Sequence, residues 1–460
     1  MTRPSQQVWR ETETFPAPGP SAESAGLAPH ARRGLSVIWL WIPLAVAWLA
    51  TTWTPYDLVF IVLAAIAYLW VRFERRTRSV VVTPRAWHVV LWTALVGIGF
   101  DILVSRLDAV DPGAARTVQV GGTVTLLAVW LLVRVRALRS AISAVLLFSI
   151  LVGASFIARV DQPGIDVWRA HDGAAQVLAA GGNPYTDLDL TLEPGSDEGR
   201  LRQYFYPPVT LAWYSIWTIL LDDPRWGSLL AWLVILLIGS VASLRSRHPE
   251  LGLAIVAFVA VQPGWFFLLT GSFTEPLIAM FVTIAMATVV KRPRLAAVIL
   301  GVGLASKQHL LLALPAVVLR WWRSSRMQSV LVGATAVTLF ALGCLFGPAA
   351  YLSAVLLAPT LASPNADSVN LYALGTVFGL DFAWPQWIAV LAATLVGLFL
   401  STRRRSSSWP ADHIALVLAT FLFLIPFPIW SHWMIVTMML SIAAFVECVA
   451  VPQAPRSNCG

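Results

Sequence analysis

Long apolar runs separated by short polar segments make up most of this 460-residue chain. The runs hold roughly 16 to 20 residues each, about the length that a helix needs to cross a ~30 Å hydrocarbon layer. Backbone amides inside a lipid layer must be hydrogen-bonded within their own segment, which favours helices as the spanning elements. The pattern predicts an all-α polytopic membrane protein with about 12 transmembrane helices, in a range of about 11 to 14.

Arginines mark the ends of the apolar runs in the first third of the chain. They cluster before the first run, between the second and third, and between the fourth and fifth. Positively charged loops favour the cytoplasmic side, so the polar loop after the fifth run is expected on the outer face. The five expected spans are Leu35–Ala50, Leu58–Val71, Trp87–Val104, Thr117–Val133 and Ile142–Ile157.

Charge clusters also limit the spans downstream of that loop. A non-spanning helix is expected over Pro207–Asp223, because a further crossing there would place Arg245 outside. Only about 25 residues separate Arg294 from Arg320, which is too few for two full spans. We therefore expect a re-entrant or broken helix pair with Lys307 near its turn. The other expected spans are Leu229–Ser243, Ala254–Leu269, Leu277–Val290, Val330–Phe346, Ile388–Leu400, Ile414–Phe427 and Met434–Ala450, with a second external region at Gly347–Trp387.

Composition supports the membrane interpretation and excludes several other classes. Hydrophobic residues make up 58% of the chain and charged residues 12%, whereas a soluble domain has about 25% charged residues. The net charge of +8 comes from arginines beside apolar runs, which is typical of membrane topology and not of nucleic-acid binding. The three cysteines have no metal-binding spacing, and we expect neither a metal nor another cofactor.

The polar loop after the fifth run is the strongest candidate for chemistry. Between residues 159 and 208, eight carboxylates face four arginines in a basic protein. Asp166 precedes a helical pattern that Gly181 and Gly182 should end, and Asn183-Pro184 should form the turn. Asp166 is either a base for a lipid head group or an N-cap. On the same helix, we expect His171 and Asp172 to be solvated at the surface.

Ionisable residues also lie inside or beside the apolar runs. Lys307 and His309 fall between two apolar half-segments, where a charge is costly and a functional role is the first hypothesis. Lys307 is expected either to neutralise a phosphate or to extend to the interface. Glu275 is expected at the outer mouth, either as a site residue or as a helix N-terminal charge. His432 lies among tryptophans that an interfacial belt would explain.

Five features occur along the chain in a characteristic order: Asp166, the stretch LAAGGNPY, the tetrad FYPP, Lys307, and FPIWSHW around His432. In this order the chain resembles glycosyltransferase family 87, polytopic GT-C-type enzymes that include actinobacterial polyprenyl-phosphate-mannose-dependent mannosyltransferases. The likeness covers roughly Ile142 to Val449. Two departures are the four expected spans that precede Ile142 and the single His432, where the family usually has two histidines.

The resemblance implies a hexosyltransferase that moves a sugar, expected to be mannose, from a polyprenyl-phosphate donor to a lipid or glycan acceptor. The reaction would proceed with inversion at the outer face of the cell membrane, in cell-envelope glycolipid synthesis. Asp166 would be the general base, and Lys307, Arg202 and His432 would bind the donor phosphate. The residues expected to line the substrate are Asp172, Tyr185, Tyr204, Tyr206, Glu275 and His309.

The expected organisation has four parts. Residues 1–34 form a disordered cytoplasmic tail, and residues 35–141 form additional amino-terminal transmembrane helices. Residues 142–450 form the GT-C-like catalytic module with its external loop at 159–225, and residues 451–460 form a second cytoplasmic tail. The expected partners are donor, acceptor and membrane lipids, with no nucleic acid. The alternative hypothesis is a secondary transporter or lipid flippase, which would also contain broken helices and a buried charge.

Overall fold

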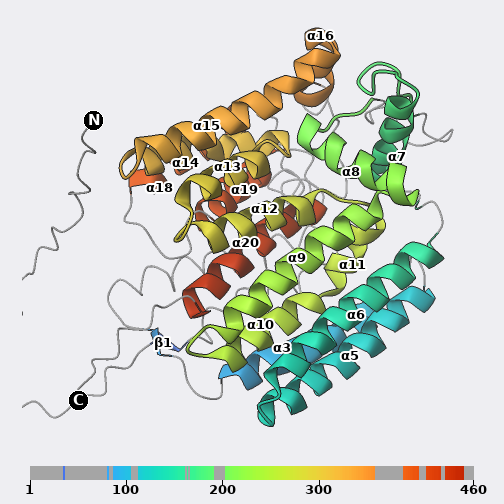
Figure 1. The fold of residues 1–460 in the computed structure, drawn as a ribbon, viewed down its shortest axis with the longest axis vertical. Coiled ribbons are helices and arrows are strands. Elements are labelled where there is room, and N and C mark those ends of the chain that lie inside the picture. Colours follow the sequence, from blue (N-terminus) through green and yellow to red (C-terminus); the bar gives the residue numbers. More distant parts are fainter. Residues whose placement is uncertain are drawn as a thin grey trace, which may run out of the picture.

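The computed structural model describes residues 35–36, 80–81, 86–104, 112–160, 163, 166–190, 203–357, 387–402, 411–425 and 430–449. Within these ranges the protein is helical, apart from one parallel pair of two-residue strands, β1 (Leu35–Ser36) and β2 (Val80–Val81). The predicted all-α class is confirmed for the described part of the chain. Figure 1 shows most of the helices lying side by side as one bundle.

Three long helices form one flank of the bundle, at the lower right of Figure 1. They pack in chain order, α3 against α5 and α5 against α6, and they confirm three of the predicted apolar helices. The span expected at Leu35–Ala50 is wrong at its start, where Leu35 and Ser36 pair with β2 as a strand. The rest of that span and Leu58–Val71 lie outside the described residues. The bounds are α3 Ala86–Val104, α5 Pro112–Arg134 and α6 Leu138–Arg159.

The middle of the bundle is built from α9, α10, α12 and α20. The predicted single span Ala254–Leu269 is instead two helices, α10 and α11, which are bent by 47° at a break before Pro263. A proline at this position has no backbone N–H to continue the helix, which explains the break. The bounds are α9 Arg225–Leu244, α10 Pro249–Ala260, α11 Pro263–Thr270, α12 Glu275–Thr288 and α20 Trp430–Val449.

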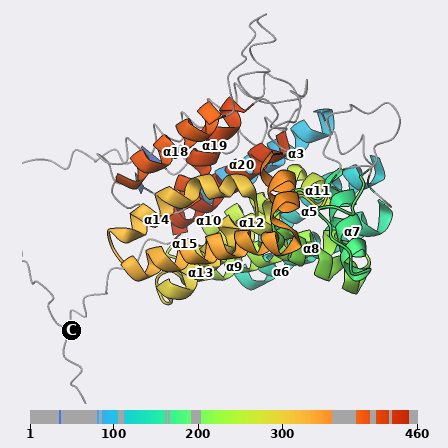
Figure 2. The ribbon, with the colours of Figure 1, turned by 90° about the horizontal axis from the view of Figure 1, so that it is seen from above.

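The remaining helices cover the other flank. Seen from above, α18 and α19 lie on one side of this flank and α13 and α15 on the other, with α14 between them (Figure 2). The predicted break near Lys307 is present between α13 and the 3₁₀ helix η2. The bounds are α13 Pro293–Leu304, η2 Gln308–Ala313, α14 Leu314–Trp322, α15 Arg326–Ala341, η3 Leu342–Phe346, α16 Pro348–Leu352, the π-helix η4 Ser353–Leu357, α18 Trp387–Thr402 and α19 Ala411–Leu424.

Among the described residues, four helices are long and apolar enough to cross a membrane, or five if the bent α10–α11 pair is one span. Large apolar side chains lie exposed on α5, α6, α15 and α18, as expected for surfaces that face lipid. The membrane character of the protein is thus supported. The count of about 12 spans and their orientation stay predictions, since six further apolar helices have only 10–17 residues. The four spanning helices are Ala115–Arg134, Leu138–Arg159, Arg225–Leu244 and Arg326–Phe346.

Candidate functional site

Two short helices, α7 (Asp166–Ala179) and α8 (Pro208–Leu221), lie together at one end of the bundle, at the upper right of Figure 1. The predicted helix inside the acidic loop is confirmed, and its first residue is Asp166. Gly181 adopts a left-handed φ of 78°, and the Gly182 N–H donates to the Val177 carbonyl at 2.9 Å. This is the glycine-dependent helix end that the sequence predicts.

The Asn183-Pro184 turn is confirmed as well. The Asn183 side-chain oxygen accepts a hydrogen bond from the Tyr185 N–H at 3.0 Å, as expected for asparagine in a turn. The Asn183 side-chain amide donates to the Phe346 carbonyl at 2.6 Å and so ties the turn to η3. The Tyr185 hydroxyl donates to the Tyr206 carbonyl at 2.8 Å. Two of the motifs singled out in the sequence are therefore joined by a direct hydrogen bond.

His171 of α7 lies among three tyrosines, Tyr204, Tyr206 and Tyr214, which are called the tyrosine box below. Its ring stacks on Tyr214 at 4.1 Å and on Tyr206 at 4.9 Å between ring centroids. Its Nδ1 lies 3.2 Å from the Tyr204 hydroxyl. The prediction that His171 is solvated at the surface is wrong, because only 1% of the residue is exposed. The amphipathic pattern of α7 is compatible with this burial, since His171 lies four positions after the buried Val167 and four before the buried Ala175, on the same helix face.

Burial and then the positive charge of Lys307 lower the pKa of the His171 imidazole from 6.5 to about 3. His171 is therefore neutral in the folded protein near neutral pH. Asp172 is half-buried, which agrees with its predicted place at the surface, and it accepts a hydrogen bond from the Gln176 amide at 2.8 Å. Burial, followed by the nearby Asp223 and Asp222, raises the pKa of the Asp172 carboxyl. A partly desolvated carboxylate beside two others holds a proton more readily than an exposed one.

We expect the free energy of unfolding to fall as the pH drops from 6.5 towards 3, because the buried His171 resists protonation in the folded protein. The unfolded chain binds a proton at this residue near pH 6.5, whereas the folded protein resists protonation down to about 3. Each pH unit in this window should cost about 1.4 kcal/mol of unfolding free energy. The measurement is equilibrium unfolding in detergent between pH 4 and 7 (about the range where the histidine titrates) for wild type and His171→Gln. Identical pH slopes for the two proteins would rule out His171 as the titrating group.

Helix α8 connects this tyrosine box to the regions around Glu275 and Lys307. The Tyr214 hydroxyl donates to the Phe273 carbonyl at 2.8 Å, two residues before Glu275. The Thr210 hydroxyl donates to the carbonyl of Ser306, the residue before Lys307. One face of a single helix thus touches α7, the loop before α12 and the break after α13.

Lys307 and Glu275 form a buried ion pair. The Lys307 Nζ lies 2.7 Å from the Glu275 Oε1, and the exposed fractions of the two residues are 5% and 0%. Glu275 is the first residue of α12 and precedes Pro276, as expected for a charge at a helix N-terminus. Lys307 is extended, with φ −147° and ψ 134°, in the break before η2. Of the two roles expected for Lys307, extension to the interface is wrong, because the ammonium contacts a buried carboxylate.

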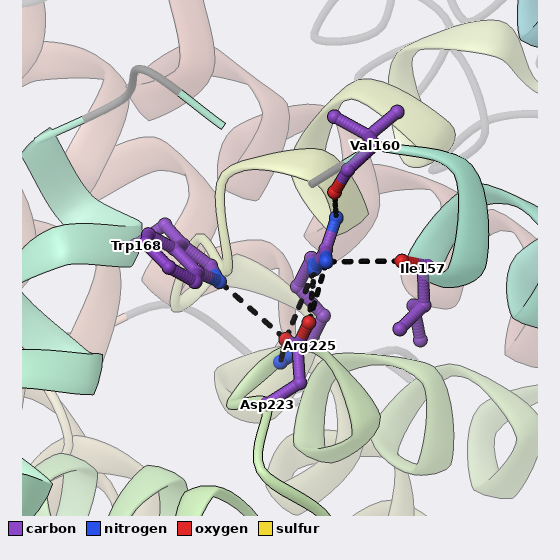
Figure 3. A network of polar contacts seen from close by, with 5 residues as sticks. All are labelled: Ile157, Val160, Trp168, Asp223 and Arg225. Carbon is purple, nitrogen blue, oxygen red and sulfur yellow. Dashed lines mark hydrogen bonds and ion pairs between the residues drawn. The ribbon is translucent and has the colours of Figure 1, made fainter. Parts of the chain in front are cut away.

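A second charged network holds the start of α9 against α6 and α7 (Figure 3). Arg225 is 3% exposed and pairs with Asp223, and its guanidinium donates to the carbonyls of Ile157 and Val160 at the end of α6. The Trp168 indole of α7 donates to Asp223 at 3.4 Å. The arginine satisfies carbonyls that the end of α6 leaves without helical partners. Because Trp168 lies two residues after Asp166, this network fixes the start of α7.

The structure brings together some of the predicted site residues and leaves others undescribed. Tyr204, Tyr206, Glu275 and Lys307 lie in or next to the α7–α8 contact region, with Tyr185 bonded to Tyr206. The His309 ring instead packs near Phe421 of α19, at 5.9 Å between centroids. Arg202 lies outside the described residues. For Asp166 and His432 only the backbone is described, as the start of α7 and part of α20.

Sequence reasoning missed the residues that join these parts. Thr210 and Tyr214 lie in an apolar helix, where their hydroxyls were the only available signal. Asp223 and Arg225 flank Pro224 immediately before an apolar span. Two opposite charges at that position are a signal for the ion pair that fixes the start of α9. Among the described residues, no group of three or more His, Cys, Asp or Glu could hold a metal ion.

Comparison of the chain with protein-family models, with curated proteins and with solved structures found no match. The functional argument therefore depends on the geometry of the site and on the resemblance of motifs. Among the described residues, that geometry consists of a buried cation, a buried carboxylate and an aromatic box around a neutral histidine, all beside the helix that begins at Asp166.

Proposed function

We propose that this protein is a membrane glycosyltransferase that moves a hexosyl group, mannosyl by resemblance, from a polyprenyl-phosphate sugar to a lipid or glycan acceptor. One observation carries most of the support: α8 contacts both the helix that starts at Asp166 and the break that contains Lys307. A base for the acceptor and a cation for the donor phosphate must act within one substrate length. The motif order along the chain is the second support.

The reaction needs two electrostatic contributions from the protein. An acceptor hydroxyl attacks the anomeric carbon, the bond from that carbon to the donor phosphate oxygen breaks, and the polyprenyl phosphate leaves. Asp166 takes the hydroxyl proton as general base. Lys307 stabilises the negative charge that develops on the leaving phosphate. A single displacement of this kind inverts the anomeric centre.

A polyprenyl-linked donor suits an intramembrane cation. The prenyl chain of the donor is dissolved in the lipid layer and brings the phosphate to the protein along the membrane, and the buried Lys307 ammonium is scarcely screened by water. A nucleotide-sugar donor would instead call for a nucleotide-binding loop, and no such motif occurs in the sequence. We place the reaction at the outer face because the arginine clusters of the sequence predict that side for the loop that contains α7.

The test is a transfer assay with the purified protein in lipid nanodiscs. Radiolabelled polyprenyl-phosphate mannose and a membrane lipid extract should yield a labelled glycolipid, together with unlabelled polyprenyl phosphate. Nucleotide-linked mannose should give no product under the same conditions. The transporter alternative predicts a different result, namely movement of an intact substrate across proteoliposomes with no new glycosidic bond. That outcome would refute the transferase assignment.

A further inference from the structure

The Lys307–Glu275 pair is incompletely hydrogen-bonded for a purely structural ion pair. Only Oε1 of Glu275 meets Lys307, and Oε2 is buried with no hydrogen-bond partner among the described residues. A buried pair that serves stability alone normally satisfies its remaining lone pairs as well. The Glu275 carboxylate is therefore held to Lys307 by one of its two oxygens, which makes it easier for another anion to displace.

Two hydroxyls in the same loop are also left without partners. The Ser272 Oγ and Thr274 Oγ1 atoms are buried and make no hydrogen bond within the described part of the chain, and both residues are 0% exposed. Thr274 is the N-cap residue of α12, yet its side chain makes no capping bond. A threonine in that position ordinarily accepts a hydrogen bond from the first turn. Here the hydroxyl remains available as a donor.

Ser272, Thr274 and Glu275 lie within four consecutive residues at the amino end of α12, a 14-residue helix. The partial positive charge at a helix N-terminus attracts anions, and phosphate is a common ligand there. Lys307 adds a full positive charge at the same end through its contact with Glu275. Glu275 is the one acidic residue in the first turn, and its carboxylate therefore occupies a position suited to a phosphate.

We infer that the Glu275 carboxylate is an internal anion, which pairs with Lys307 in the ligand-free protein. When a ligand binds, its phosphate takes the place of this carboxylate at the Lys307 ammonium. This inference rests on the proposed function, because the phosphate is that of a polyprenyl-phosphate donor or product. The groups that bind the phosphate are Lys307, Ser272 and Thr274, which supply one ammonium and two hydroxyl donors.

The internal anion has two physical consequences. It keeps Lys307 paired in a region where an unpaired charge is costly, so the site persists without ligand. It also remains close to the bound phosphate, because Glu275 is fixed at the start of α12, and like charges repel at short range. The repulsion weakens phosphate binding and favours release of the polyprenyl phosphate product. Removing the charge should therefore tighten binding and slow release.

The experiment uses the fact that the chain has only two lysines, Lys291 and Lys307. In a Lys291→Arg background, a ¹⁵N-lysine label reports on the Lys307 ammonium alone. The probe is farnesyl phosphate, a short polyprenyl phosphate, with farnesol as the control that lacks the anion. We expect farnesyl phosphate to shift the Lys307 resonance and farnesol to leave it in place. We expect Glu275→Gln to lower the dissociation constant of farnesyl phosphate about tenfold.

A second variant protects the test against misfolding. Glu275→Asp keeps the negative charge and shortens the side chain by one methylene group, so it should weaken the contact with Lys307 and tighten farnesyl phosphate binding by a smaller factor. If Glu275→Gln folds, its kcat and KM should fall together, because product release becomes slower.

The outcomes separate the two proposals. If farnesyl phosphate shifts the Lys307 signal but neither Glu275 variant binds it more tightly, the internal-anion inference is wrong and the proposed transferase stands. If sugar transfer occurs without any shift of the Lys307 signal, Lys307 does not hold the phosphate and the inference is again wrong. If neither farnesyl phosphate binding nor transfer is seen, the proposed function itself fails.

Discussion

Lys307→Met should lower the free energy of unfolding by about 3–5 kcal/mol, because it leaves the Glu275 carboxylate buried without its counter-ion. The pair is nearly fully buried, so water cannot compensate for the loss as it does at a surface. Methionine preserves much of the apolar length of lysine, and the effect can therefore be attributed to the charge. The measurement is equilibrium unfolding in mixed micelles, with wild type and variant compared under identical conditions.

Two controls make this prediction specific. The double variant Lys307→Met/Glu275→Met removes both charges and should recover most of the lost stability, because no unpaired ion remains. Lys291 is exposed, and Lys291→Met should change the unfolding free energy by no more than about 0.5 kcal/mol. If Lys307→Met is as stable as Lys291→Met, the ion pair contributes nothing to the fold.

The helices could be predicted from the sequence because apolar periodicity and breakers determine them locally. Gly181 and Gly182 end α7 and the break in the chain falls at Lys307, as the pattern indicates. The bend between α10 and α11 was missed, because Pro263 lies inside a run of apolar residues that reads as one span. A hydropathy pattern gives the length of an apolar run but not the direction of its axis.

Contacts between distant segments could not be predicted in the same way. His171 appeared to be a solvated residue of a polar loop, and its burial depends on Tyr204, Tyr206 and Tyr214, which lie at least 33 residues further along the chain. Glu275 and Lys307 were each identified as unusual charges, but their pairing over 32 residues depends on how α12 packs against α13. Residue type indicates that a buried charge needs a partner, whereas only tertiary packing decides which one it receives.

The two parts of the site are held by different forces, and this matters for catalysis. Arg225 fixes the start of α7 through hydrogen bonds to the end of α6 and the shared contact of Trp168 with Asp223. Thr210 and Tyr214 fix α8 against the loops that contain Lys307 and Glu275. The separation between the start of α7 and the break at Lys307 is thus set by packed helices. Reacting groups on rigid elements lose less entropy when substrate binds.

Asp166→Asn should lower kcat about 10²- to 10⁴-fold, the usual contribution of a general base, and should leave KM for the donor within a few-fold of wild type. Asparagine has nearly the same shape as aspartate and caps a helix equally well, but it cannot accept a proton from the acceptor hydroxyl. The measurement is initial-rate transfer from radiolabelled polyprenyl-phosphate mannose in nanodiscs. Thermal unfolding of the same preparation checks that the fold is intact.

Two further substitutions separate catalysis from capping, which are the two roles that the position of Asp166 at the start of α7 allows. Asp166→Ser retains an N-cap hydroxyl and should be as stable as Asp166→Asn and equally inactive. Asp166→Glu retains a carboxylate on a longer side chain and should recover part of the rate. If the Asn and Ser variants are folded and turn over at the wild-type rate, Asp166 is only a helix cap. The base must then be sought among the other carboxylates at this end of the bundle, beginning with Asp172, whose raised pKa already favours proton binding.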